Sequence, residues 1–263
     1  MKLGKILRGY VLAVGFLLYL PIFLMVVNSF NVNPFIGEWR GFTLRWYALL
    51  FRDFEVIQGL TNSLTIAVMS ALLSVFLALF TSMFMVNHGK FRVMDALVYP
   101  PIVIPEVVEG VALMMAFQYA GASFGWLTVM IGHTAFNVAF AYIILNSTRV
   151  RFPELEGAAR TLGASPLQAF LKISLPLAMP GISVAIAITF LLSFTNFIKT
   201  LYTTGPGFYT LPLLIWNRAR RPGISEYAYP NALNALATIL LALSLIIALV
   251  FTAFTLKGEG NNN

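Results

Sequence analysis

The sequence contains no cysteine among its 263 residues. Disulfide bonds and thiolate metal sites are therefore excluded, and cysteine usage gives no indication of the redox compartment. Charged residues are scarce as well, at 10% of the chain, whereas soluble domains carry about 25%. The sequence also lacks a metal-ligand cluster, a Walker A phosphate loop and a Gly-x-Ser-x-Gly nucleophile motif. We therefore expect no catalytic residue, bound metal or cofactor in this chain.

Hydrophobic residues make up 59% of the chain and gather in long runs. Each run has roughly the 20 residues that a helix needs to cross a bilayer core. A water-soluble fold could not bury so many helices that are apolar on every side. The sequence predicts an all-α polytopic membrane protein, a single transmembrane domain over residues 1–263, with six spans: Gly9–Phe30, Asn62–Val86, Asp95–Tyr119, Phe124–Thr148, Gly181–Thr203 and Asn231–Leu256.

Two features interrupt this pattern. Pro100, Pro101 and Pro105 fall inside the third predicted span, where proline breaks or kinks a helix. Between the first two spans, Leu44–Phe51 combines aromatic and basic residues, which is typical of a helix lying at the membrane interface. The first span is too long for a signal peptide and lacks a cleavage site after it, so we expect it to be retained.

Basic residues favour one orientation of these spans. With the N-terminus inside, ten of them fall in cytoplasmic segments: Lys2, Lys5, Arg8, Lys90, Arg92, Arg149, Arg151, Arg160, Lys172 and Lys257. Six fall on the opposite side: Arg40, Arg45, Arg52, Arg218, Arg220 and Arg221. The positive-inside rule then places both termini in the cytoplasm of a bacterial inner-membrane protein. The net charge of +7 is spread over short loops without a basic stripe, so nucleic acid is not an expected partner.

The cytoplasmic loop at residues 149–180 predicts two short helices. Pro153 suits a first helical position, and Gly163 suits the left-handed residue that closes a helix. Ser165 followed by Pro166 is typical of the cap and first turn of a second helix, which Pro176 would end. The first helix carries a stripe of small and apolar residues on one face: Leu155, Ala158, Ala159 and Leu162. Such a face can dock into a groove of another protein or lie on the lipid surface.

The same loop resembles the EAA loop of binding-protein-dependent ABC importer permeases. That motif reads Glu-Ala-Ala, three residues, Gly, nine residues, Ile-x-Leu-Pro. It is matched here by Ala158, Ala159, Gly163, Ile173, Leu175 and Pro176. Gly157 stands where the motif has glutamate, and Glu156 precedes it, about 100° round the helix. The resemblance implies that this loop couples the permease to an ATPase.

The resemblance covers nearly the whole chain. Residues 41–47, Ser193-Phe-Thr, Thr204-Gly-Pro206, Leu211-Pro212 and residues 234–238 are similar to the spermidine/putrescine permease branch. It implies a type I importer fold that pairs with a second permease subunit, either a paralogue or a copy. It also implies two cytoplasmic ATPase subunits, which bind the ATP, and a periplasmic substrate-binding protein.

Four polar residues are candidates for the translocation pathway: Glu106, Glu109, Asn196 and Lys199. Glu106 and Glu109 lie 11 and 14 residues past Asp95, near mid-membrane depth, and share a helix face. Ionisable groups at that depth normally face a cavity or a partner, although the prolines could instead leave both in an outer loop. Lys199 could pair with them or extend to the interface. His133, Asn137 and Gln118 are more typical of hydrogen bonds between helices.

The substrate is not determined by these residues. Permeases of the polyamine branch tend to carry an acidic pair where this chain has Thr195 and Asn196. A polyamine, an opine-like or amino-acid-like compound and a phosphonate all remain open. An ion-gradient-driven secondary transporter is the alternative function, but the inverted repeats typical of that class are not found.

Overall fold

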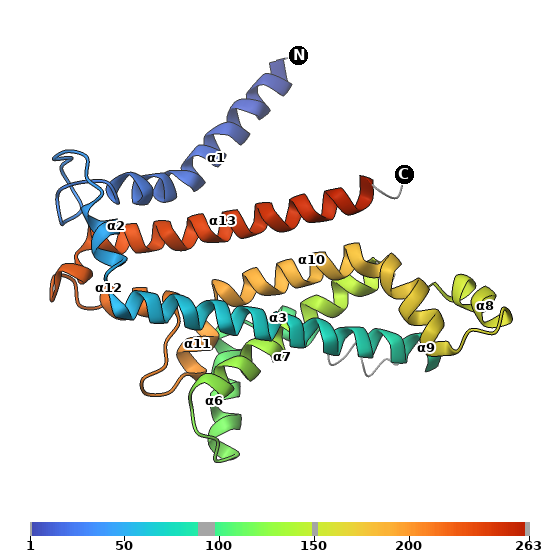
Figure 1. The fold of residues 1–263 in the computed structure, drawn as a ribbon. Coiled ribbons are helices and arrows are strands. Elements are labelled where there is room, and N and C mark those ends of the chain that lie inside the picture. Colours follow the sequence, from blue (N-terminus) through green and yellow to red (C-terminus); the bar gives the residue numbers. More distant parts are fainter. Residues whose placement is uncertain (1, 89–97, 149–151, 261–263) are drawn as a thin grey trace. The chain divides into compact units, whose positions relative to one another are not determined.

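The computed structural model describes residues 2–88, 98–148 and 152–260. Over these residues the chain forms helices joined by turns, with one isolated β-bridge between Asn31 and Phe42 (Figure 1). Several residues used above to predict spans and orientation lie outside the described residues: Lys90, Arg92, Asp95, Arg149 and Arg151. The chain divides into two compact units, which are described separately.

The first unit comprises Met1–Gln58 and Leu214–Leu243. It contains α1 (Lys2–Asn28), α2 (Arg45–Leu50), the start of α3 (Phe54–His88), most of α12 (Leu211–Ala219), the 3₁₀ turn η2 (Glu226–Ala228) and the first part of α13 (Pro230–Gly260). Leu12 and Tyr19 of α1 are exposed, as expected for a helix whose surroundings are apolar.

Polar contacts hold the loop between α1 and α2 in place. The indole Nε1 of Trp46 donates to the carbonyl of Asn31 at 2.8 Å, and only 1% of the Trp46 side chain is exposed. The side-chain amide of Asn231 donates to the carbonyl of Asn33 at 2.6 Å. The predicted helix at residues 44–51 is therefore present as α2, but Trp46 packs inside the protein. The Trp46 ring is thus the core of the folded loop.

The second unit comprises Gly59–Leu213 and Ser244–Asn263. Besides the remainders of α3, α12 and α13, it contains α5 (Pro100–Val103), α6 (Glu106–Tyr119), α7 (Trp126–Ser147), α8 (Pro153–Thr161), α9 (Pro166–Ala169), the π turn η1 (Phe170–Ser174), α10 (Leu175–Phe194) and α11 (Ile198–Thr203). Small residues such as Ala78, Ala141 and Ala185 are fully buried where α3, α7 and α10 meet. Small side chains let membrane helices approach closely, which is how these three pack.

Five helical segments of the described chain are long and apolar enough to cross a membrane: Leu7–Asn28, Phe54–Ser82, Trp126–Ser147, Pro166–Phe194 and Pro230–Ala253. They overlap five of the six predicted spans. The third predicted span is divided, since α5 ends at Val103, the following Ile104 is extended with a ψ of 135°, and α6 begins after Pro105. The 14 residues of α6 are shorter than a full span, so the count of six stays a prediction.

The fifth span differs from its prediction at both ends. The helix runs without interruption from Pro166 to Phe194, so Pro176 does not end the second loop helix and the span does not begin at Gly181. The wider π turn at Phe170–Ser174 lies directly before Pro176, where a missing N–H is tolerated because the hydrogen-bond pattern is already changing. At the far end, the helix stops at Phe194 and restarts as α11.

Candidate functional site

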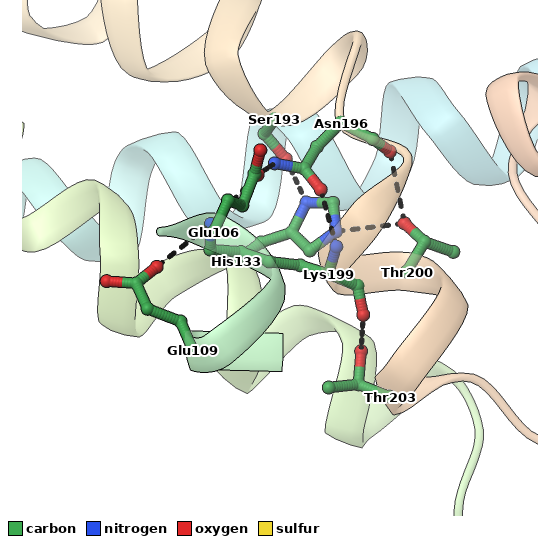
Figure 2. A network of polar contacts seen from close by, with 8 residues as sticks. All are labelled: Glu106, Glu109, His133, Ser193, Asn196, Lys199, Thr200 and Thr203. Atoms are coloured by element: carbon green, nitrogen blue, oxygen red, sulfur yellow. Dashed lines mark hydrogen bonds and ion pairs between the residues drawn. The ribbon is translucent and has the colours of Figure 1, made fainter. Parts of the chain in front are cut away.

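Lys199 of α11 forms a buried ion-pair cluster with two carboxylates of α6. Its Nζ lies 2.9 Å from Oε1 of Glu106 and 3.2 Å from Oε2 of Glu109. Only 1% of the Lys199 side chain is exposed. A buried ammonium group is costly unless it is paired, and here two carboxylates pair it (Figure 2). Of the two options for Lys199, pairing is confirmed and extension to the interface is wrong.

The local sequence places both carboxylates at the start of α6. Pro105 precedes the helix, and Glu106 and Glu109 occupy its first turn. Being three residues apart they share a helix face, and the positive end of the helix dipole favours their charge. The prediction of a shared face is confirmed by their common contact with Lys199. Both residues lie in a regular helix, which begins directly after Pro105.

Asn196 organises the break between α10 and α11. Its Oδ1 accepts the backbone N–H of Lys199 at 2.9 Å, which caps the restarting helix. Its Nδ2 donates to Oε1 of Glu106, the same oxygen that Lys199 contacts. An aspartate at this position would place a third carboxylate beside Glu106. An amide suits this position, because the Asn196 side chain and the Lys199 ammonium both donate to the same carboxylate of Glu106.

Two glycines let α11 approach its neighbours closely. A Cβ added to Gly110 of α6 would lie 2.7 Å from the ring of Tyr202, and one added to Gly132 of α7 would lie 3.2 Å from Thr203. Side chains larger than hydrogen would push α11 away from both helices. These glycines therefore set the distance at which Lys199 reaches the carboxylates of α6.

A buried hydrogen-bonded network lies behind the ion pairs. The two ring nitrogens of His133 bond the hydroxyls of Ser193 at 2.7 Å and Thr200 at 3.0 Å. The Asn137 amide donates to the carbonyl of Thr189 at 3.0 Å. The predicted interhelical role of His133 and Asn137 is confirmed, since these bonds join α7 to α10 and α11. Gln118 instead has an exposed side chain near the end of α6, so that prediction was wrong within this chain.

A pocket of about 380 Å³ adjoins the ion-pair cluster. Glu109 and Lys199 contribute to its wall, and its remaining lining is apolar: Pro101, Ile104, Val108, Ala112, Leu113, Ala116, Ala135 and Phe136. The Lys199 Nζ lies 3.4 Å from the ring centroid of Phe136, within cation–π range. Sequence analysis missed Phe136, Ser193 and Thr200. The two hydroxyl residues could have been noticed as polar positions beside an otherwise apolar span.

The loop helices α8 and α9 lie at the end of α10 opposite to α11 (Figure 1). Pro153 begins α8, Gly163 has a left-handed φ of +92°, and Ser165 caps α9 by accepting the N–H of Gln168. All three local predictions are confirmed. Apolar side chains remain exposed along this segment: Leu155 (49%), Leu162 (90%), Leu167 (64%) and Leu171 (48%).

The other motif positions divide between the surface and the interior. Gly157, Ala158 and Pro176 are exposed, whereas Ala159, Ile173 and Leu175 are half-buried. Glu156 is buried, and its carboxylate accepts a hydrogen bond from the Ser174 hydroxyl. Glu156 therefore fastens α8 to the π turn η1. The 100° offset from the motif position predicted a different direction for this side chain, and the structure shows that it points into the protein.

Three comparisons bear on this arrangement. A family model described as "Binding-protein-dependent transport system inner membrane component" matches residues 76–256. The chain is 32% identical over 252 residues to the spermidine/putrescine transport system permease protein PotC of Escherichia coli K12, covering 94% of this chain and 93% of PotC. It is 26% identical over 257 residues to the putative 2-aminoethylphosphonate transport system permease protein PhnV of Salmonella typhimurium LT2, covering 93% and 92%.

The fold also has a counterpart among solved structures. A chain of a bacterial ABC transporter involved in the import of the acidic polysaccharide alginate matches with a TM-score of 0.67 and 19% identity, over 98% of this chain and 99% of that one. At that identity the likeness concerns the fold, which is that of a type I importer permease.

Proposed function

Because the chain belongs to the family of binding-protein-dependent transport system inner membrane components, we propose that Glu106, Glu109, Asn196 and Lys199 line its solute pathway and that residues 149–180 couple it to an ATPase. The chain is a transmembrane permease subunit of an ATP-driven importer in the bacterial inner membrane. It is a transport subunit, and ATP is hydrolysed by a separate subunit of the assembly. This identification replaces the secondary-transporter alternative.

Importers of this kind combine permeases with an ATPase and a periplasmic binding protein. We propose that this chain pairs with one further permease, a copy or a paralogue, so that each supplies half of the pathway. Two ATPase subunits then contact the cytoplasmic loops, and both chain termini lie in the cytoplasm.

The exposed leucines of α8 and α9 support the coupling proposal. Leu155 of α8 and Leu162 at its C-terminal cap lie about two turns apart on the same side. Leu167 of α9 and Leu171 of η1 follow along the chain. Apolar side chains in a polar loop lose contact with water when they enter a groove of a partner, which drives docking. Glu156 and Ser174 hold α8 against η1, so a push on this surface is transmitted to α10.

The observation that carries the pathway proposal is the ion-pair cluster at the wall of an apolar pocket. Charged groups within a membrane-embedded region are expensive and mark solute or ion paths. Glu106 keeps 40% of its side chain exposed despite its pairing with Lys199, so one carboxylate remains open to a solute. The substrate we propose is a small polar or cationic solute, such as a polyamine or an opine-like or amino-acid-like compound.

Reconstitution tests this function. The permease, its partner permease, the ATPase and the binding protein are placed in proteoliposomes, and uptake of candidate labelled amines is measured. We expect uptake that requires ATP and the binding protein and is unaffected by a protonophore. Uptake by this chain alone, driven by a proton or sodium gradient, would contradict the proposal.

A further inference from the structure

The position of the Lys199 ammonium group has the features of an amine-binding site. Two carboxylates lie at 2.9 and 3.2 Å from Nζ, and the face of Phe136 lies at 3.4 Å. Carboxylates and an aromatic face are the groups with which proteins recognise ammonium ligands. Here the ammonium is supplied by the protein itself. Figure 2 shows Lys199 reaching from α11 toward the two glutamates of α6.

This cluster is accessible to a solute on one side. Glu109 and Lys199 both line the pocket of about 380 Å³, a volume within the range of small-molecule sites. Glu106 is 40% exposed, while Glu109 is 12% exposed. A ligand in the pocket would therefore meet the carboxylates from the side that Lys199 leaves open.

The charges at the cluster leave room for one further cation. Glu106 and Glu109 contribute −2, Lys199 contributes +1, and the sum is −1. Among the described residues that line the pocket, none of the others carries a formal charge. Asn196 supplies a hydrogen-bond donor to Glu106 without adding charge. One solute ammonium group balances this cluster, whereas two would leave an excess positive charge in a region of low dielectric.

We propose that Lys199 is a specificity-determining residue: it permanently occupies one of two ammonium positions and so selects solutes that carry a single ammonium group over diamines. The inference rests on the proposed pathway role of these residues. A diamine brings its second ammonium toward the one that Lys199 already holds, and the two like charges repel. A monoamine, or a solute with one amine and an uncharged or anionic end, avoids this repulsion. Among the substrates proposed above, an opine-like or amino-acid-like compound therefore fits the cluster better than a polyamine.

Two variants separate charge from shape. Lys199→Met keeps a long unbranched side chain but changes the sum from −1 to −2. Glu109→Gln combined with Lys199→Met returns the sum to −1 without a lysine. Each variant is purified in lipid nanodiscs with its partner permease and ATPase, and without the binding protein, whose own selectivity would mask that of the pathway. Butan-1-amine and butane-1,4-diamine serve as probes of equal length.

The measured quantity is the concentration of each amine that gives half of its maximal stabilisation of the assembly against heat. In the wild type we expect butan-1-amine to act at the lower concentration. In Lys199→Met the ratio of the two concentrations should shift by about tenfold toward the diamine, because the second position is vacated. The double variant, with its restored sum of −1, should return to the wild-type ratio.

An unchanged ratio in Lys199→Met would overturn the proposal. It is also overturned if neither amine stabilises the wild type, Lys199→Met or the double variant. If Lys199→Met does not fold, Glu109→Gln alone decides the matter. Its sum of charges is zero, so the concentration of each amine that gives half-maximal stabilisation should rise by about tenfold. An unchanged concentration for both amines overturns the proposal. ATP-dependent uptake by the wild type is measured separately, so its absence counts against the proposed function and not against this selectivity.

Discussion

The loop helices α8 and α9 and the Lys199 cluster stand at opposite ends of the same helix, yet they are built in opposite ways. The loop consists of neighbouring residues whose apolar side chains are exposed, with Leu162 at 90%. The cluster joins residues 90 or more positions apart and buries their charges, with Lys199 at 1%. One is an exposed apolar surface, and the other is a charged group buried inside the protein.

This difference teaches which substitutions separate function from folding. An exposed leucine contributes little to the stability of the free chain, so its replacement should leave folding intact. A buried ion pair is different, because removal of one partner leaves the other charged and desolvated. Substitutions at the cluster should therefore affect stability and transport together, and substitutions on the loop surface should affect coupling only.

The largest effect should follow from the double substitution Glu106→Gln and Glu109→Gln. It keeps the side-chain shapes but leaves the Lys199 ammonium without a counter-charge, at a cost of about 3–5 kcal/mol of folding stability. We expect a lower melting temperature and a fall in uptake of about 100-fold, steeper for cationic than for neutral solutes. Glu154→Gln, at an exposed glutamate of α8, is the matched control and should change stability by less than about 0.5 kcal/mol. Normal uptake at wild-type membrane abundance would rule out the pathway role.

A smaller effect is expected from Gly163→Val, which strains the loop without touching the cluster. A β-branched residue at a φ of +92° costs about 1–3 kcal/mol and shifts α8 relative to α9. ATPase binding and uptake should fall by about tenfold, while the stabilisation of the assembly by amines stays at the wild-type level. Gly157→Ala controls for the added methyl group, because its Cβ meets nothing within 4 Å. Unchanged substrate-stimulated ATPase activity in Gly163→Val would refute the coupling role.

Leu162→Glu should sharpen the contrast by altering function at almost no cost in stability. The side chain is 90% exposed, so we expect the melting temperature of the isolated chain to stay within the error of measurement. A carboxylate at a docking surface must lose its water, so co-purification of the ATPase should weaken severalfold. Leu162→Met keeps the apolar contact and should co-purify normally. Equal ATPase recovery with both variants would show that this face is not the docking surface.

The smallest perturbation tests whether the two regions open to opposite sides of the membrane. Cysteine is absent from the chain, so Thr161→Cys in α8 and Ser123→Cys beside the start of α7 can each be labelled alone. Both variants should reach the membrane at wild-type abundance. A membrane-impermeant maleimide added to spheroplasts should label Ser123→Cys, and Thr161→Cys should react only after the membrane is opened. The reverse pattern would invert the predicted orientation.

Local features were readable from the sequence because they depend on neighbouring residues. Pro153, Gly163 and Ser165 each follow a rule of helix termini that acts within a few positions, and each has its predicted conformation. The long apolar helices were likewise evident from composition. The pairing of Lys199 with Glu106 and Glu109 was one of two options and needed the structure to decide it.

The features that sequence analysis missed depend on packing between distant segments. Phe136 contacts Lys199 only because Gly132 admits α11 against α7. The end of α10 at Phe194 depends on Asn196, whose side chain bonds both α11 and α6. The π turn before Pro176 has no local sequence rule, so a proline-ended helix was expected where a continuous one is found.

The close packing of α10 on α7 has a mechanical consequence at Gly181 and Thr148. A Cβ at Gly181 would lie 2.2 Å from the Thr148 hydroxyl, so α10 touches the end of α7 near the middle of the helical run Pro166–Phe194. The helix extends about 20 Å to either side of this contact. If α10 turned about it, a tilt of about 10° would carry the two ends by about 3–4 Å in opposite directions. That displacement is comparable to the 2.9 Å contact of Lys199 with Glu106, so it would be enough to open or close the ion pair if α11 moved with the end of α10.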